Sequence, residues 1–67
     1  MSVRLSQLRN FVAVAEAGSL RAGTRQAGMS QPALTRSLQQ LEGELRARLL
    51  LRSARGVSLT PAGRAFL

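Results

Sequence analysis

Residues 20–38 read LRAGTRQAGMSQPALTRSL, and this stretch determines how the chain folds. It predicts a short helix over residues 20–27, a sharp turn at Gly28 and a longer helix that opens at Ser30, because Gly favours helix ends and Ser favours helix starts. The outer face of the longer helix is polar and basic. A short helix that braces a longer one at a Gly turn is typical of a helix-turn-helix, which places its second helix in the major groove of DNA.

The chain before this stretch predicts one more helix. Apolar residues recur at the helical period over residues 4–17, and Gly18 follows as the C-cap. The residues of this stripe are Leu5, Leu8, Phe11, Val12 and Ala15. Val14 lies outside the stripe, so it is either a single exposed apolar residue or part of a second contact surface.

The longer helix has a narrow apolar stripe formed by Leu34, Leu38, Leu41 and Leu45. These side chains cover an arc of about 60° at the helical repeat, which suits contact with a core. The stripe spans too few heptads for a coiled coil, so we expect core packing rather than a dimer contact.

The rest of the chain predicts a hairpin followed by the start of a helix. Residues 49–53 and 57–59 have the pattern of short strands around the loop 54–56, which ends in Gly. Thr60 is the expected N-cap and Pro61 the first helical residue. This helix has about two turns before the sequence ends, and isolated helices of that length are unstable. We therefore expect the sequence to be cut from a longer protein.

The charge balance favours an anionic partner. The chain holds ten arginines, three glutamates and no lysine, histidine or aspartate, for a formal net charge of +7. Such a field attracts polyanions, although it does not by itself give sequence specificity. The planar arginine fork suits phosphates and guanine edges. Codon usage in a GC-rich genome would also explain arginine in place of lysine, but not the shortage of acids.

Size and composition disfavour several classes of function. A chain of 67 residues forms one small domain of marginal stability. Because Cys and His are absent, there is no disulfide and no thiolate metal site, and we expect no metal and no cofactor. Glu42 and Glu44 do not face each other on a helix, so an enzyme is disfavoured, and Glu42 is expected to balance nearby arginines. No secretion signal and no apolar span of about 20 residues is present, so the expected location is cytoplasmic.

Two other functions remain open at this point. A cationic, membrane-surface-active helical protein would carry a sustained basic amphipathic helix with aromatic anchors. In this chain the aromatic residues are two phenylalanines, and the arginines are scattered along the sequence. Single-stranded nucleic-acid binding uses stacking aromatics, and Trp and Tyr are absent. Binding of double-stranded DNA is therefore the interpretation we favour.

The first candidates for contact with base edges lie in the first two turns of the longer helix. They are Gln31, Pro32, Thr35 and Arg36. Gln pairs with adenine and Arg with guanine, while Thr and Pro offer apolar contact to a thymine methyl group. A solvated polar face would have the same spacing.

Four further residues are candidates for contact with the DNA backbone or minor groove. Ser19 and Ser30 are predicted N-caps, and the free N–H groups of helix N-termini suit phosphate oxygens. Arg52 and Arg55 lie in the predicted hairpin, where a basic tip enters a narrow minor groove. The alternative for the hairpin is a tip that only aids solubility.

Residues spread over almost the whole chain match one known family. They are QLRNFVAVAE at 7–16, GSL at 18–20, SQPALTR at 30–36, LE at 41–42 and RSARGVSLTPAG at 52–63. Together they resemble the N-terminal DNA-binding domain of the LysR-type transcriptional regulators. The resemblance implies a mostly α, winged helix-turn-helix fold with a three-helix core, a short two-stranded wing and the start of a linker helix. It implies a DNA-binding domain over residues 1–59 and a truncated, dimerising linker helix that starts within residues 60–67.

The resemblance also implies a function. In this family the recognition helix, here residues 31–45, enters the major groove, and the wing, here residues 50–59, lies on the minor groove or backbone. The parent protein forms a homodimer or higher oligomer through the linker helix and has a C-terminal effector-binding domain, which is missing here. We therefore predict a bacterial transcription regulator that binds double-stranded DNA sequence-specifically and has no membrane partner.

Several positions depart from the family pattern. Gly23 and Thr24 stand where the family usually has two alanines, at the closest approach of two helices, and Gly in a helix costs about 0.5–1 kcal/mol. Gly43 and Leu51 each stand where the family commonly has an acid. Arg46 occupies the usual glycine C-cap, so we expect this helix end to be less sharply set. These changes add positive charge and are expected to lower stability.

Overall fold

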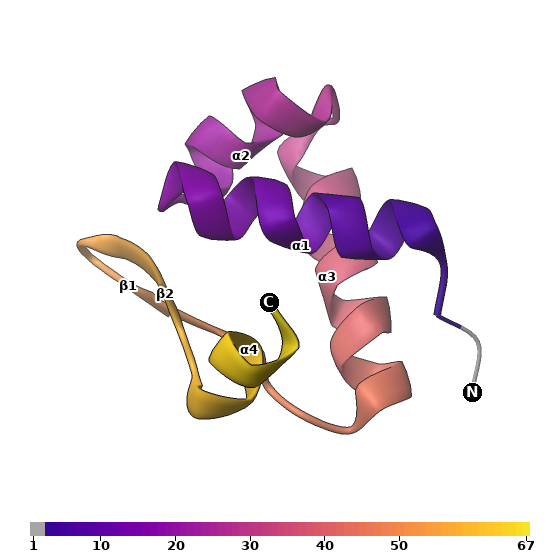
Figure 1. Ribbon diagram of the computed structural model, residues 1–67. Helices are drawn as coiled ribbons and strands as arrows, with labels where there is room; N and C mark the ends of the chain where they lie inside the picture. The colour runs from indigo at the N-terminus through magenta and orange to yellow at the C-terminus, as the bar shows by residue number, and fades with distance from the viewer. Residues whose placement is uncertain (1–2) are drawn as a thin grey trace.

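The computed structural model describes residues 3–67, so the first two residues of the predicted 1–59 domain lie outside the described residues. Its elements in chain order are α1 (Leu5–Ala17), α2 (Leu20–Ala27), α3 (Gln31–Leu45), β1 (Leu50–Ser53), β2 (Gly56–Leu59) and α4 (Pro61–Phe66). Figure 1 shows α1 crossing α3, with α2 packed beside both and the hairpin projecting to one side. The predicted mostly α, winged helix-turn-helix fold is confirmed.

The ends of α1 and α2 follow the local sequence signals. Gly18 and Gly28 adopt left-handed conformations, with φ of 79° and 69°, and stop the two helices. The Ser19 and Ser30 hydroxyls each accept the backbone N–H three residues later, at 3.1 and 3.3 Å. Both serines are therefore N-caps, as predicted, and each satisfies a donor that the first turn would leave unpaired.

The apolar core lies where α1, α2 and α3 meet and extends to the segment after α3. Its buried members are Phe11, Val14, Leu20, Leu34, Leu38, Leu41, Leu49 and Leu50. Val14 is 0% exposed, so the alternative of a single exposed residue was wrong. The alternative of a second contact surface fits the structure, because Val14 lies against Gly23 of α2. Leu5, which we placed in the stripe, is 63% exposed. The reason is that α1 packs against α2 as well as α3, which turns its buried face toward Phe11 and Val14.

Gly23 lies where α2 approaches α1 and α3 most closely. A Cβ at this position would lie 2.8 Å from Cγ2 of Val14 and 3.4 Å from Cδ2 of Leu34. The predicted close approach of the helices is therefore present, and the missing side chain makes room for it.

The end of α3 differs from the expectation. Arg46 adopts a left-handed conformation, with φ of 54°, which is the conformation a C-cap glycine takes. The N–H of Ala47 donates to the carbonyl of Glu42 at 3.2 Å, and this bond closes the last turn. The helix therefore ends sharply at Leu45, although a residue with a Cβ occupies the strained position.

The wing is an antiparallel hairpin that pairs Leu50 with Leu59 and Ser53 with Gly56. Because Gly56 belongs to the ladder, the turn is one residue shorter than predicted. Leu49, which we placed in the first strand, lies outside it, because its N–H donates to the carboxylate of Glu42 instead of to the other strand.

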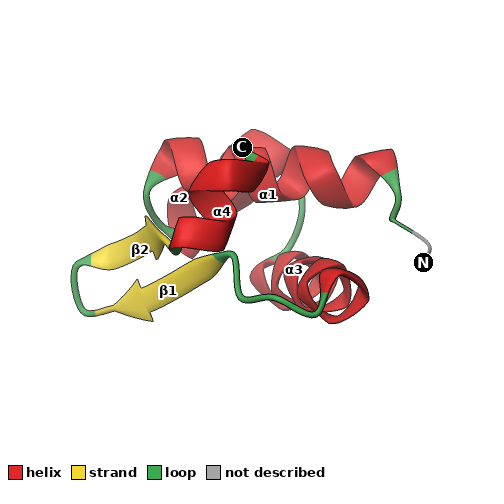
Figure 2. Ribbon diagram, turned by 60° about the horizontal axis from the view of Figure 1, so that its bottom comes forward, coloured by secondary structure: helices red, strands yellow, loops and turns green. Residues whose placement is uncertain are grey.

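The short helix α4 is fixed to the base of the wing. Figure 2 shows it lying over the start of β1 and the end of β2. The Thr60 hydroxyl accepts the N–H of Gly63 at 2.9 Å, and the N–H of Thr60 donates to the Leu49 carbonyl at 3.0 Å. At the far end of α4, the ring of Phe66 meets that of Phe11 edge to face, with centroids 6.0 Å apart. Gly63 is buried, and a Cβ there would overlap the Leu49 carbonyl oxygen.

Candidate nucleic-acid interface

The four residues predicted to contact base edges lie together on the solvent side of α3. Gln31, Pro32, Thr35 and Arg36 line one shallow hollow of about 440 Å³, and Gln39 extends it by a further turn. Three of the four are exposed and Thr35 is half-buried, whereas the leucines of α3 face the core. The structure therefore presents these side chains as one surface.

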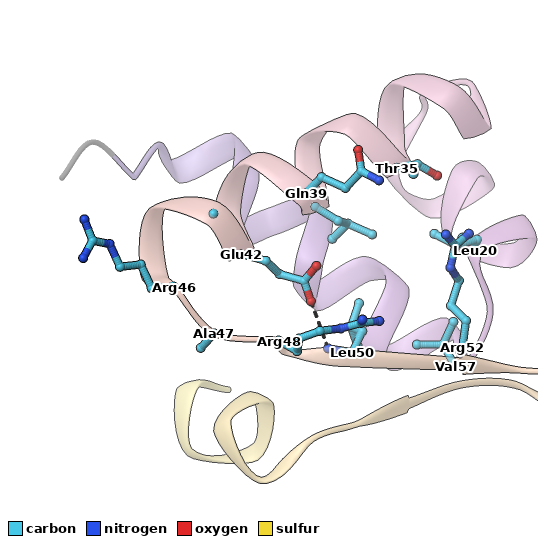
Figure 3. A pocket seen from close by; sticks show the side chains of 12 residues that line it. Leu20, Thr35, Gln39, Glu42, Arg46, Ala47, Arg48, Leu50, Arg52 and Val57 are labelled. Carbon is cyan, nitrogen blue, oxygen red and sulfur yellow. Dashed lines mark hydrogen bonds between the residues drawn. The ribbon is translucent and has the colours of Figure 1, made fainter.

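A groove of about 530 Å³ separates α3 from the wing. Figure 3 shows Thr35 and Gln39 on its α3 wall and Arg48 and Arg52 on the opposite wall. Arg46, at the end of α3, also lines the groove. Arg52, which we predicted to lie in the hairpin, thus shares this groove with Thr35, one of the four residues predicted to contact base edges. Arg48 and Arg52 give the wall opposite α3 cations of the kind that contact phosphates. The carboxylate of Glu42 and four apolar side chains, Leu20, Leu38, Leu50 and Val57, also line the groove.

Glu42 holds the two walls of this groove together. Its carboxylate accepts the N–H groups of Leu49 at 2.8 Å and Leu50 at 3.3 Å, and Figure 3 marks the second bond. We expected this carboxylate to balance arginines, but its contacts are with the backbone that leads into β1. These bonds fix the start of the wing relative to α3.

The start of β2, next to the turn of the wing, is bound to the turn in front of α2. The N–H of Val57 donates to the Gly18 carbonyl at 2.8 Å. A side chain on Gly56 would overlap that same carbonyl, and Cβ of Ser19 lies 3.8 Å from the position its Cβ would take. The start of α2, where Ser19 is the N-cap, is therefore adjacent to the wing.

The remaining predicted residues lie at the edges of this face. Ser30 is exposed at the start of α3, before the shallow hollow. Arg55 is exposed in the turn of the wing and lines neither the hollow nor the groove. The structure thus brings the α3 residues and Arg52 together and leaves Arg55 at a separate tip.

Sequence reasoning missed two residues of this surface. Gln39 follows Thr35 by one helical turn, so the spacing that selected Thr35 also indicates Gln39. Arg48 lies in the loop between α3 and β1, and no periodicity in the sequence predicts the path of that loop. Its position depends on the bonds between Glu42 and the backbone of residues 49–50.

Neither a metal-binding cluster nor a membrane-spanning helix is found in the part of the chain that the structure describes. Residues 3–67 contain no group of three acidic, His or Cys side chains that could hold a metal ion. Within the same residues, no helix is long and apolar enough to cross a membrane.

Comparison with known proteins identifies the family of this fold. Residues 5–64 match the model of the bacterial regulatory helix-turn-helix proteins of the lysR family. The chain is 52% identical over 61 residues to the HTH-type transcriptional regulator TcbR of Pseudomonas sp. strain P51, covering 91% of this chain and 21% of that protein. It is 49% identical over 65 residues to the regulator TfdT of Cupriavidus pinatubonensis, covering 97% of this chain and 28% of that protein. The chain thus spans between about a fifth and just over a quarter of the length of these relatives.

Solved structures agree with this assignment. The CbnR_DBD-DNA complex matches with a TM-score of 0.88 at 51% identity, covering 100% of this chain and 75% of that one. The BenM_DBD/benA site 1 DNA complex matches with a TM-score of 0.85 at 42% identity, covering 98% of this chain and 74% of that one. The fold, the family model and the relatives agree, and the chain belongs to the lysR family of bacterial regulatory helix-turn-helix proteins.

Proposed function

We propose that this domain binds double-stranded DNA sequence-specifically as part of a bacterial transcription regulator. The observation that carries the proposal is the exposed cluster of Gln31, Pro32, Thr35 and Arg36 on the first turns of α3, beside a groove that contains Arg52. A helix that enters the major groove by its N-terminus brings these turns to the base edges. Similar domains have been solved with DNA.

The residues take different roles in this proposal. The four residues of the shallow hollow contact base edges in the major groove. Ser19 and Ser30 present the N-termini of α2 and α3 to phosphates. Arg52 contacts the backbone from the groove, and Arg55 contacts the backbone or the minor groove from the tip of the wing. To these we add Gln39 and Arg48, which line the same groove.

The proposal extends to the parent protein. We infer that residues 1–59 form the DNA-binding domain and that residues 60–67 begin a linker helix that pairs two subunits into a homodimer or higher oligomer. The known relatives are transcription regulators, which supports a role without catalysis and a cytoplasmic location, where the bacterial chromosome lies. The alternative of a membrane-surface-active protein finds no support in these relatives.

Selection from a random duplex library tests the proposal. Duplexes retained by the domain are sequenced, and the enriched sequence and a scrambled version are titrated by bandshift, with anionic vesicles in a parallel sedimentation assay. We expect a shared sequence to emerge and the scrambled duplex to bind more weakly, by about 1–3 kcal/mol for each lost base contact. Equal affinity for all duplexes, or binding to vesicles alone, would contradict the proposal.

A further inference from the structure

One buried polar contact joins α1 to the recognition helix. The side-chain amide of Asn10 donates to the hydroxyl of Ser37 at 2.8 Å, and the two residues are 9% and 8% exposed. The residues are 27 positions apart in the chain, on α1 and α3. Neither residue lines the shallow hollow on α3 or the groove between α3 and the wing.

The leucines that hold α3 against α1 and α2 have no directional preference, and the hydrogen bonds of Glu42 join α3 to the segment that follows it and not to α1 or α2. Leu34, Leu38 and Leu41 are buried, and apolar packing is non-directional. A stripe of leucines follows a small rotation of the helix when the neighbouring side chains repack, because apolar packing requires no particular angle. The hydrogen bond of Ser37 does not tolerate this rotation, because it requires both a distance and an angle.

A simple estimate shows how strongly the hydrogen bond between Asn10 and Ser37 restricts the rotation of α3 about its axis. Side-chain atoms lie about 5 Å from the helix axis, so a rotation of about 20° moves them by about 1.7 Å. An amide-to-hydroxyl bond tolerates only about 0.5 Å of change in distance. Arg36 extends further from the axis than Ser37, so the same rotation moves its guanidinium by a larger amount.

We propose that Asn10 and Ser37 form a positioning pair that sets the rotation of α3 and thereby the sequence preference of the domain. The proposal rests on the proposed DNA binding. Ser37 faces α1, while its neighbour Arg36 faces solvent. A hydrogen bond that fixes the rotation of α3 at Ser37 therefore also fixes the direction in which Arg36 leaves the helix. The pair acts through the residues that contact bases and touches no DNA itself.

The pair can be removed without leaving a buried polar group. Either Asn10→Leu or Ser37→Ala alone leaves the partner unpaired, which lowers stability. The double variant replaces both partners by apolar groups, and such a replacement is nearly neutral for stability. The double variant therefore shows the effect of losing the hydrogen bond that orients α3 without a large loss of stability.

The experiment compares the unmodified domain, both single variants and the double variant. Urea unfolding gives the stability, and bandshift titration below the unfolding range gives the affinity for the selected and scrambled duplexes. In the double variant we expect the urea midpoint to return toward the unmodified value, while the ratio of the two affinities falls at least about fivefold, the lower bound for one lost base contact. The affinity for the scrambled duplex should stay unchanged, because phosphate contacts tolerate a small rotation.

Val12→Ala is the matched control on the same helix. Val12 packs against the core as a partly buried residue and takes no part in the hydrogen bond of the pair, so its loss lowers stability and leaves that bond in place. We expect its affinity ratio to equal that of the unmodified domain.

The outcomes are distinguishable. An unchanged ratio in the double variant would make the pair purely structural and overturn the proposal. If the double variant does not fold, Ser37→Ala decides, because Ala favours the helix and an unchanged ratio there overturns the proposal equally. A domain that prefers no duplex even when unmodified would instead refute the proposed function, and this result appears before any variant is compared.

Discussion

Arg36 and Arg55 carry the same charged group at two different places on the proposed interface. Arg36 lies in the hollow on α3, and Arg55 lies in the turn of the wing. We expect Arg36→Ala to lose a base contact, weakening binding to the selected duplex by about 1–3 kcal/mol and leaving the scrambled duplex little changed. We expect Arg55→Ala to weaken both and to lower the salt slope by about 1.

Titration of both variants on both duplexes at several salt concentrations checks this difference. If Arg36→Ala leaves the affinity ratio unchanged, then Arg36 is a phosphate contact. In that case the contacts with base edges would be made by Gln31, Pro32 and Thr35.

Two glycines inside helices predict opposite effects of the same substitution. A Cβ at Gly43 meets nothing within 4 Å, so Gly43→Ala should raise the free energy of unfolding by about 0.5–1 kcal/mol. A Cβ at Gly23 would press on Val14, and overpacking costs about 1–3 kcal/mol, so Gly23→Ala should lower the stability by about 1 kcal/mol. Urea unfolding measures both. If Gly23→Ala stabilises as much as Gly43→Ala, the helices separate freely at this site.

The position of α4 depends on Gly63. Because the Leu49 carbonyl occupies the space where a Cβ would lie, Gly63→Ala should push α4 off the base of the wing and release Phe66 from Phe11. We expect a loss of about 1–3 kcal/mol in the free energy of unfolding. Gly43→Ala is the control, since it makes the same change at an open helical position. A Gly63→Ala variant of unchanged stability would show that α4 adds little to the fold.

The sequence predicted those elements whose signals are local. The bounds of α2 followed from Ser19 and Gly28, because a cap acts within a turn of its own residue. The buried face of α1 and the start of β1 were missed, since they depend on contacts between distant segments. Val14 is buried by its contact with α2, and Leu49 is held by Glu42 from α3. Periodicity within one element does not contain this information.

The candidate site was predictable to a similar extent. The four residues of the α3 hollow follow from helical spacing and from the Ser30 cap. Arg52 and Arg48 lie beside these residues only because of the way the wing packs against α3. The bond between Asn10 and Ser37 could not be predicted, because neither residue stands out from the polar residues around it.

At the scale of the molecule, the net charge of +7 predicts salt-dependent binding. If each domain neutralises roughly four phosphates, the logarithm of the affinity should fall against the logarithm of the salt concentration with a slope of about −3.6 per domain. Bandshift titration over a salt series measures the slope. Arg9→Ala is the control, because Arg9 is an exposed residue of α1 that lines neither the hollow nor the groove, and its loss should leave the slope unchanged. An affinity independent of salt would contradict electrostatic binding.

Association of two domains should be weak in this chain without DNA. The helix α4 offers six residues for pairing, and Phe66 and Leu67 are the large apolar side chains exposed near it. We expect sedimentation to show mostly monomer, with two copies assembling on a dyad-symmetric duplex whose half-sites lie about one helical turn apart. A tight dimer in free solution would place the contact elsewhere, and not at Val14, which is buried.

The contact between Phe11 and Phe66 has a consequence for synthesis of the chain on the ribosome. Phe11 belongs to the first helix, whereas its ring partner and the core residues Leu49 and Leu50 follow α3 in the chain. Translation adds roughly 5–20 residues per second, so Phe66 is made about 1–4 s after the last residue of α3. Until these later residues are available, α1 and α3 lack contacts that complete the core, and we expect the domain to reach its folded state only after residues 49–66 have been made.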